Sequence, residues 1–207
     1  MVKSKHNPLI YNFFKIYALW KIRRNFRRVL ITGEFNENNK AILLISNHFS
    51  WWDGFWAMYL NLKIFRRRFH FMMLEEQLEK FWFFKYTGGY PVRRRSRSVL
   101  ESINYTIELL SRRQNLVLLF PQGRLESLYK SSITFEKGVT RIASEINGKA
   151  QVIFVVNLVD YLSETKPSLY VYLKEYTMEN QHAEGIEQAY NAFLSECFSK
   201  QIKSVND

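Results

Sequence analysis

The sequence predicts a single α/β domain with a mostly parallel central sheet flanked by helices and preceded by an N-terminal amphipathic helix. Three observations predict this fold. Short, uninterrupted apolar runs recur along the chain, helical patterns separate them, and 207 residues with 47% hydrophobic residues suffice for one sizeable core. Apolar runs bounded by turns are typical of strands that are buried on both faces, as strands of parallel sheets are.

The expected elements alternate along the chain. The expected strands are residues 41–45, 69–74, 116–120, 152–156 and 169–173. The expected helices are residues 9–29, 51–62, 75–86, 98–112, 135–146 and 184–203. Ser98 and Glu101 have the spacing of a capping box, which supports a helix start at Ser98. With no internal repeat, we expect residues 1–30 to form a helical segment at a membrane interface and residues 31–207 to form the α/β domain.

The composition points to an anionic partner and to extra apolar surface. The 30 basic and 19 acidic residues give a net charge of +11, which favours nucleic acid, an anionic membrane surface or an acidic protein as partner. Aromatic residues make up 16% of the chain, more than an ordinary core requires. The only cysteine, Cys197, excludes a disulfide framework and a cysteine-rich zinc site.

The N-terminal helix combines a broad apolar side with a basic second half. Its basic residues are Lys21, Arg23, Arg24, Arg27 and Arg28. A basic helix that carries Trp and Phe can settle into a bilayer interface, or it can pack on the core with a solvated basic face; the two interpretations are compatible. The apolar stretch 8–20 is broken by Asn12 and Lys15 and is shorter than the roughly 20 residues of a spanning helix. We therefore expect peripheral or monotopic attachment to the cytoplasmic face of the cell membrane.

A histidine and an aspartate follow the first buried run. His48 and Asp53 lie five residues apart, with Ser50 placed to cap the helix that follows. This puts His48 in the turn between strand and helix and Asp53 in the first helical turn. A carboxylate there can hold the imidazole in one tautomer, so that His48 acts as a general base for a hydroxyl or an amine. A histidine that only caps a helix is the alternative interpretation.

A second unusual segment, residues 120–124 (Phe-Pro-Gln-Gly-Arg), ends another buried run. Ligands of open α/β sheets bind at the carboxyl ends of the strands, so both segments are expected at one edge. Gly123 permits a close backbone approach, and Arg124 offers a guanidinium fork for a phosphate or a carboxylate.

Two arginine triplets and an aromatic run complete the candidate features. Residues 93–95 follow two glycines and a tyrosine-proline pair, which favours anion binding, whereas residues 66–68 are typical of a solvated face. Residues 81–84 (Phe-Trp-Phe-Phe) are apolar all round a helical turn, so part of this run must meet another helix, a hydrocarbon chain or lipid.

These motifs resemble those of the lysophospholipid acyltransferases, of the bacterial 1-acyl-sn-glycerol-3-phosphate acyltransferase type in the glycerolipid acyltransferase superfamily. Asn47, His48 and Asp53 match the family's first block, which is Asn-His, four residues and Asp. The other blocks resemble residues 89–94, 120–124 and 135–139. In order and spacing, the resemblance covers roughly residues 27 to 160.

The sequence departs from the family pattern at three places. Gln122 replaces a glutamate, Arg124 follows the glycine without an intervening small residue, and the strand near Val152 lacks a proline. The fold and the acyl-transfer chemistry survive these changes, whereas the identity of the acceptor does not follow from the resemblance.

The resemblance implies transfer of a fatty acyl group from acyl-CoA or acyl carrier protein to a hydroxyl of a membrane lipid acceptor, foremost 1-acyl-sn-glycerol 3-phosphate. In that reaction His48 is the general base and Asp53 orients it. The implied acceptor-binding residues are Arg93, Arg94, Gln122, Gly123 and Arg124. Neither a metal nor a cofactor is implied.

Two other interpretations remain open at this stage. The same chemistry can act on an aminoacyl lipid, a glycolipid or a pigment alcohol. A basic nucleic-acid-binding protein is the distant alternative, and we expect no nucleic acid partner because the basic residues are scattered and no nucleic-acid-binding motif is present.

Overall fold

The computed structural model describes residues 2–93, 98–177 and 185–204. They form one α/β fold around a seven-stranded sheet with the strand order β1-β7-β6-β2-β5-β3-β4. The strands are β1 (Val29–Thr32), β2 (Ala41–Ser46), β3 (Arg68–Leu74), β4 (Gly89–Val92), β5 (Asn115–Leu119), β6 (Ala150–Asp160) and β7 (Ser168–Tyr176). Every neighbouring pair is parallel except β6 and β7, so the predicted mostly parallel sheet is confirmed.

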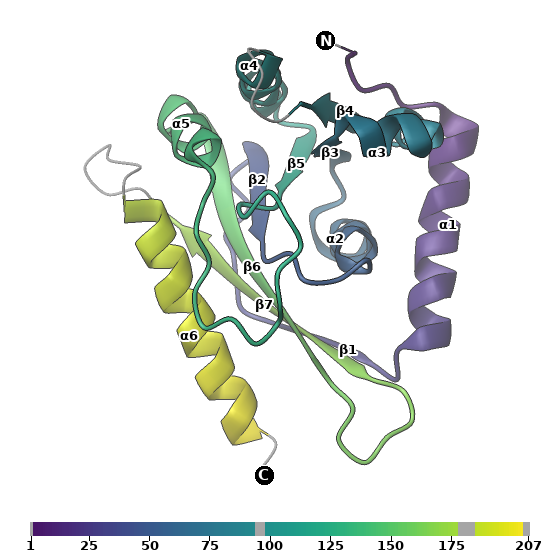
Figure 1. The fold of residues 1–207 in the computed structure, drawn as a ribbon, viewed down its shortest axis with the longest axis vertical. Coiled ribbons are helices and arrows are strands. Elements are labelled where there is room, and N and C mark those ends of the chain that lie inside the picture. Colours follow the sequence, from purple (N-terminus) through teal and green to yellow (C-terminus); the bar gives the residue numbers. More distant parts are fainter. Residues whose placement is uncertain (1, 94–97, 178–184, 205–207) are drawn as a thin grey trace.

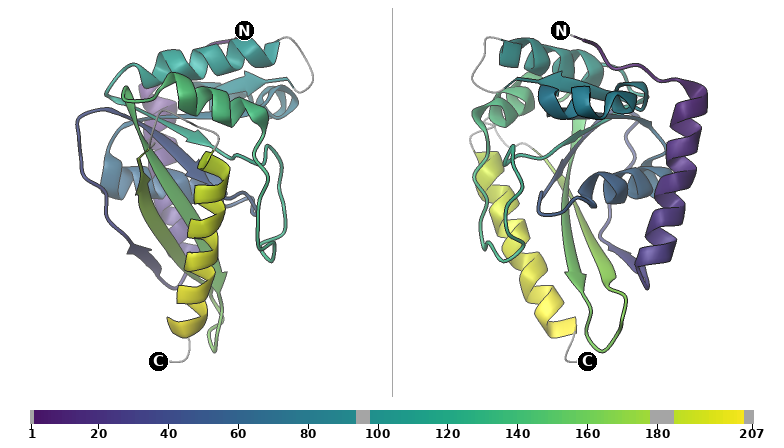
Figure 2. Two further views of the ribbon diagram at one scale, coloured as in Figure 1. Left: turned by 90° about the vertical axis from the view of Figure 1, so that its left-hand side faces the viewer. Right: turned by 45° about the vertical axis from the view of Figure 1, so that its right-hand side comes forward.

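Helices cover both faces of the sheet (Figures 1 and 2). The α-helices are α1 (Pro8–Asn25), α2 (Asp53–Leu60), α3 (Glu75–Lys80), α4 (Ser98–Leu110), α5 (Lys137–Glu145) and α6 (Ile186–Ser204). Two short helices complete the set, the π-helix η1 (Asn61–Phe65) after α2 and the 3-10 helix η2 (Trp82–Tyr86) after α3. Among the described residues, no helix is both long and apolar enough to cross a membrane.

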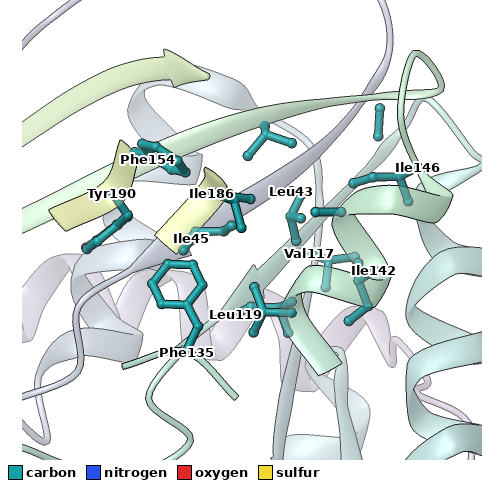
Figure 3. Close-up of a cluster of buried hydrophobic side chains, with 14 of the residues drawn as sticks. Leu43, Ile45, Val117, Leu119, Phe135, Ile142, Ile146, Phe154, Ile186 and Tyr190 are labelled. Atoms are coloured by element: carbon teal, nitrogen blue, oxygen red, sulfur yellow. The ribbon is translucent and has the colours of Figure 1, made fainter. Parts of the chain in front are cut away.

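Alternate residues of the central strands divide the core into two layers. Leu43 and Ile45 of β2 contribute to a cluster with α4, α5 and α6, which Figure 3 shows around Phe135, Phe154 and Tyr190. The residues between them on β2 face the opposite way, into a cluster with α1 and α2. All six residues of β2 are buried, as the uninterrupted apolar run predicts.

The sequence misses the two edge strands, β1 and β4. β4 contains a glycine and a proline, both of which are rare in strands, and Pro91 is tolerated because β4 pairs on one side only. The predicted helix 9–29 ends earlier, at Asn25, because Arg27 donates its backbone N–H to Pro167 and Arg28 accepts one from Leu169, which draws the chain into β1 beside β7.

The N-terminal helix has one face on the domain and another in solvent. Ala18 and Ile22 are buried against α2, whereas Leu9, Phe13 and Ile16 are 83%, 60% and 69% exposed. The packing of one face on the core is confirmed, whereas the bilayer-interface interpretation of the exposed face stays a prediction. We call the exposed residues Leu9, Phe13, Ile16 and Trp20 the apolar stripe of α1.

Candidate active site

The site begins directly after the last residue of β2, at the carboxyl edge of the sheet. There Asn47 is clamped to the middle of β6: its side-chain N–H donates to the Asn157 carbonyl at 2.9 Å, and its side-chain oxygen accepts from the Asn157 N–H at 2.9 Å. The Asn157 side chain in turn donates to the Ser46 hydroxyl at 3.0 Å. These buried hydrogen bonds fix the backbone directly before His48.

The structure brings His48 and Asp53 into direct contact. The Nδ1 atom of His48 lies 2.7 Å from Oδ2 of Asp53, which is the first residue of α2. Because a carboxylate accepts this hydrogen bond, Nδ1 carries the proton and the lone pair of the imidazole lies on Nε2. The His48 side chain is 24% exposed, and among the described residues Nε2 has no hydrogen-bond partner, so this lone pair is accessible to a reactant.

The Asp53 carboxylate is held rigidly in a fully buried position. The same Oδ2 atom accepts the backbone N–H groups of Phe49 at 2.8 Å and Ser50 at 2.9 Å, whereas Oδ1 has no donor among the described residues. Burial raises the pKa of Asp53, and the hydrogen bonds from His48, Ser50 and Phe49 oppose that rise. Asp53 therefore orients His48 and favours its charged form once it has accepted a proton.

The end of β5 supplies the second wall of the site. Phe120 stacks on the His48 ring, with the ring centroids 4.0 Å apart and the planes 11° from parallel. The turn that follows is closed by a hydrogen bond from the Gly123 N–H to the Phe120 carbonyl at 3.0 Å. The Glu126 N–H then donates to the His48 carbonyl at 2.9 Å, so the two segments form one unit, as predicted from the strand ends.

Gln122 and Gly123 lie in the turn beside this unit. Gly123 has a φ of +62°, and an added Cβ would lie 3.0 Å from the Glu136 side chain, so a larger residue is strained here. Gln122 is buried, and its side-chain oxygen has no donor among the described residues. A buried oxygen without a donor at the wall of the site is a candidate contact for a bound group.

The predicted arginines lie at different distances from the catalytic pair. Arg124 follows Gly123, is 67% exposed, and forms an ion pair with Glu126 at 3.0 Å. Arg93 follows β4, three strands away from β2, and forms an ion pair with Glu75 at 2.5 Å. At about 4.8 Å per strand, that separation is roughly 14 Å. Arg94 lies outside the described residues.

Three contributors to the site escape the sequence analysis. Phe120 gives no signal of its ring stacking, the Glu126 N–H is a backbone group, and Asn157 lies 110 residues from its partner Asn47. Its partner Asn47 could be singled out from the sequence, because it belongs to the Asn-His pair of the first motif. Among the described residues, no three His, Cys, Asp or Glu side chains gather to form a metal site.

Comparison with known proteins identifies the class of enzyme to which this site belongs. A family model described as "Acyltransferase" matches residues 27–158, which is more than half of the chain. The chain therefore belongs to the acyltransferase family, whose reaction requires an acyl donor and an acceptor. A search of curated proteins gave no match.

The burial of Asp53 predicts that its replacement separates activity from stability. Because the folded pKa is raised above the unfolded value of about 3.9, the stabilisation from its proton is complete below that value and is lost as the pH rises through the folded pKa. The asparagine of Asp53→Asn does not ionise, so the variant does not lose stability in this way as the pH rises. At pH 7 we therefore expect the variant to be at least as stable as the wild type. Acyl transfer should fall about 10²- to 10⁴-fold, because the amide no longer stabilises a charged His48.

Urea unfolding measured across the acidic to neutral range, together with initial rates of acyl transfer, checks both parts. The wild-type stability should decline relative to the variant as the pH rises. A variant that is less stable than the wild type at pH 7 would show that ionised Asp53 stabilises the fold.

Proposed function

We propose that this protein is an O-acyltransferase that moves a fatty acyl group from acyl-CoA or acyl carrier protein to the free hydroxyl of 1-acyl-sn-glycerol 3-phosphate, in phospholipid biosynthesis. The observation that carries the proposal is the contact of 2.7 Å between His48 and buried Asp53, which leaves Nε2 accessible at the carboxyl edge of the sheet. Membership of the acyltransferase family supports the same class of reaction.

The geometry suits direct transfer without a covalent enzyme intermediate. His48 Nε2 accepts the proton of the acceptor hydroxyl while its oxygen attacks the thioester carbonyl carbon. The tetrahedral intermediate then collapses, the carbon–sulfur bond breaks, and His48 returns the proton to the leaving thiolate. Asp53 stabilises the imidazolium between these two proton transfers.

The phosphate of the acceptor is assigned to the turn after β5. Arg124 lies there with most of its guanidinium in solvent, and Gln122 offers a buried amide beside it. Arg93 follows β4 at the same edge, and Arg94 is the next residue in the sequence; we assign both as further positive charge for the head group or the donor. An acidic acyl carrier protein is also attracted by the net charge of +11.

A different lipid acceptor is favoured by one observation. Gln122 is neutral, and Arg124 is already paired with Glu126, so the turn holds less uncompensated positive charge than its sequence indicates. An aminoacyl lipid, a glycolipid or a pigment alcohol places less negative charge there. Mass spectrometry of lipids from cells with and without the protein distinguishes these acceptors from 1-acyl-sn-glycerol 3-phosphate.

We further propose that the enzyme lies on the cytoplasmic face of the cell membrane through α1. Aromatic rings connect α1 to the catalytic turn. The ring centroids of Tyr17 and Phe55 lie 6.0 Å apart, and those of Phe55 and Trp51 lie 4.7 Å apart; Trp51 is 63% exposed. An apolar groove of about 520 Å³ between α1 and η2 widens the same surface. A lipid acceptor can pass from the bilayer to His48 along this surface without its chain entering water.

His48→Ala is expected to lower acyl transfer by about 10²- to 10⁴-fold with little change in stability, since the removed ring is a general base at the surface of the site. The measurement is a thioester-cleavage assay coupled to acceptor consumption, with thermal unfolding as the control for folding. Retention of more than about a tenth of the wild-type rate in a folded variant would refute the mechanism.

Arg124→Ala is expected to raise the KM for the phosphate-bearing acceptor by roughly 10- to 150-fold and to leave the KM for the donor nearly unchanged. Arg124→Lys should recover only part of the loss, because lysine lacks the fork. Saturation curves that vary each substrate in turn decide the assignment. A shift confined to the donor curve would place Arg124 in the donor site.

The double variant Leu9→Gln, Phe13→Gln should bind phospholipid vesicles at least about tenfold more weakly, because two exposed apolar side chains no longer enter the bilayer. Leu100→Gln, Ile202→Gln is the matched control, since it removes exposed apolar side chains from α4 and α6 on the opposite face. Vesicle flotation compares the two. Equal losses would show that α1 is not the contact surface.

A further inference from the structure

A cavity of about 470 Å³ opens near the amino ends of the strands, whereas His48 lies at their carboxyl ends. It lies between α1, η1 and the start of β3, and its lining includes Tyr11, Asn12, Lys15, Arg66, Arg67 and Arg68. Arg68 is the first residue of β3 and pairs in register with Asn115, the first residue of β5, whereas Phe120 follows the last residue of β5. The cavity and the catalytic pair are therefore separated by the length of the buried strands, about 16 Å.

The cavity carries positive charge that the described residues neutralise only in part. Of its four cationic side chains, Arg67 alone has an acidic partner among the described residues: its guanidinium pairs with Glu37, and it also donates to the Arg113 carbonyl. Within the described ranges, no carboxylate lies within ion-pair distance of Lys15, Arg66 or Arg68. Three uncompensated cations around one cavity favour a bound anion.

Arg68 is oriented for such an anion by a neutral histidine. Its Nε donates to Nδ1 of His6 at 3.0 Å, and Nε2 of His6 in turn donates to the Phe69 carbonyl at 2.9 Å. Burial is the main cause that lowers the pKa of His6 to about 4; the charges of Arg68 and Lys15 act in the same direction, and the hydrogen bond to the Phe69 carbonyl opposes them. The neutral ring therefore accepts from Arg68 without repelling it. Among the described residues, the two terminal nitrogens of Arg68 have no partner, and they provide the fork that matches a phosphate.

The chain that carries the three arginines is also fixed. Buried Asn61 accepts the Arg67 N–H at 3.0 Å and donates to the Arg67 carbonyl at 2.9 Å, and its own carbonyl accepts the Arg66 N–H at 2.6 Å. Arg66 adopts a left-handed backbone conformation with φ of 54°, which is uncommon for a residue other than glycine or asparagine. The turn is therefore built by specific contacts and does not depend on the arginine side chains.

The cavity borders the apolar stripe of α1. Asn12 and Lys15 of the cavity are sequence neighbours of Phe13 and Ile16 of the stripe, and one residue corresponds to about 100° around a helix. We propose that this cavity binds the phosphate of an anionic membrane phospholipid, whose acyl chains lie beside the apolar stripe of α1, at a site separate from the catalytic centre. The proposal rests on the membrane contact proposed above and names the lipid class that strengthens it.

Two triple variants test the cavity with equal changes in net charge. Lys15→Gln, Arg66→Asn, Arg68→Gln removes the three cations that have no acidic partner among the described residues, and asparagine keeps the left-handed turn at position 66. Arg141→Gln, Lys149→Gln, Lys203→Gln removes three exposed cations of the α5 and α6 side. In flotation with vesicles of phosphatidylcholine and phosphatidylglycerol in equal parts, we expect the first variant to bind roughly 10²-fold more weakly and the second to bind like the wild type.

Arg68→Lys distinguishes a built phosphate site from general attraction, because it keeps the charge and loses the fork. We expect it to weaken binding to the anionic vesicles several-fold and to leave binding to pure phosphatidylcholine vesicles unchanged. Thermal unfolding confirms that each variant is folded. Wild-type binding by Arg68→Lys, or equal losses in the two triple variants, would overturn the proposal.

Calorimetry with inorganic phosphate separates a lipid head group from a free phosphate. If the cavity variant loses affinity for inorganic phosphate while its vesicle binding matches the wild type, the cavity takes a soluble phosphate and the lipid assignment is wrong. If the wild type floats with neither kind of vesicle, the membrane contact itself is wrong. The acyl-transfer assay of His48→Ala is independent of both results, so the proposed reaction stands or falls separately.

Discussion

Strand β2 is buried along its whole length, and the rest of the structure depends on that constraint. Both helical layers pack on it, one on Leu43 and Ile45 and the other on the residues between them. Its neighbours β5 and β6 are parallel to it, so the ends of three strands are fixed relative to one another. The catalytic turn follows β2 directly and gains its position from this core, with the Asn47 clamp to β6 as the final restraint.

The same core imposes an electrostatic cost on the site. Asp53 is fully buried, and three hydrogen bonds converge on one of its oxygens while the other has no donor among the described residues. Burying a carboxylate is unfavourable unless it is paired, so the contact with His48 both offsets that cost and sets the tautomer of the ring. The burial of Asp53 therefore costs the fold some stability, and in return the carboxylate orients His48.

The sequence predicted what is encoded locally. The uninterrupted apolar runs gave the central strands, and the five-residue spacing of His48 and Asp53 gave their contact, because both lie in one turn. The edge strands β1 and β4 were missed because they are short, half-paired and contain residues untypical of strands. The Asn47–Asn157 clamp and the ring of Phe120 were missed because only the folded sheet brings such distant segments together.

The ion pairs of the arginines are a feature that sequence alone does not reveal. The triplet 66–68 reads as a solvated face, yet Arg66 and Arg68 line a cavity and have no acidic partner among the described residues. Arg124, which reads as a phosphate ligand, is already paired with Glu126, and hydrogen bonds from Lys130 and Arg124 lower the pKa of that carboxyl. An anion at Arg124 must therefore share the guanidinium with a carboxylate, whereas an anion in the cavity meets three cations, Lys15, Arg66 and Arg68, that have no acidic partner among the described residues. The two proposals therefore assign anion sites of different selectivity: a permissive one that holds the enzyme on a charged surface, and a demanding one beside the reacting hydroxyl.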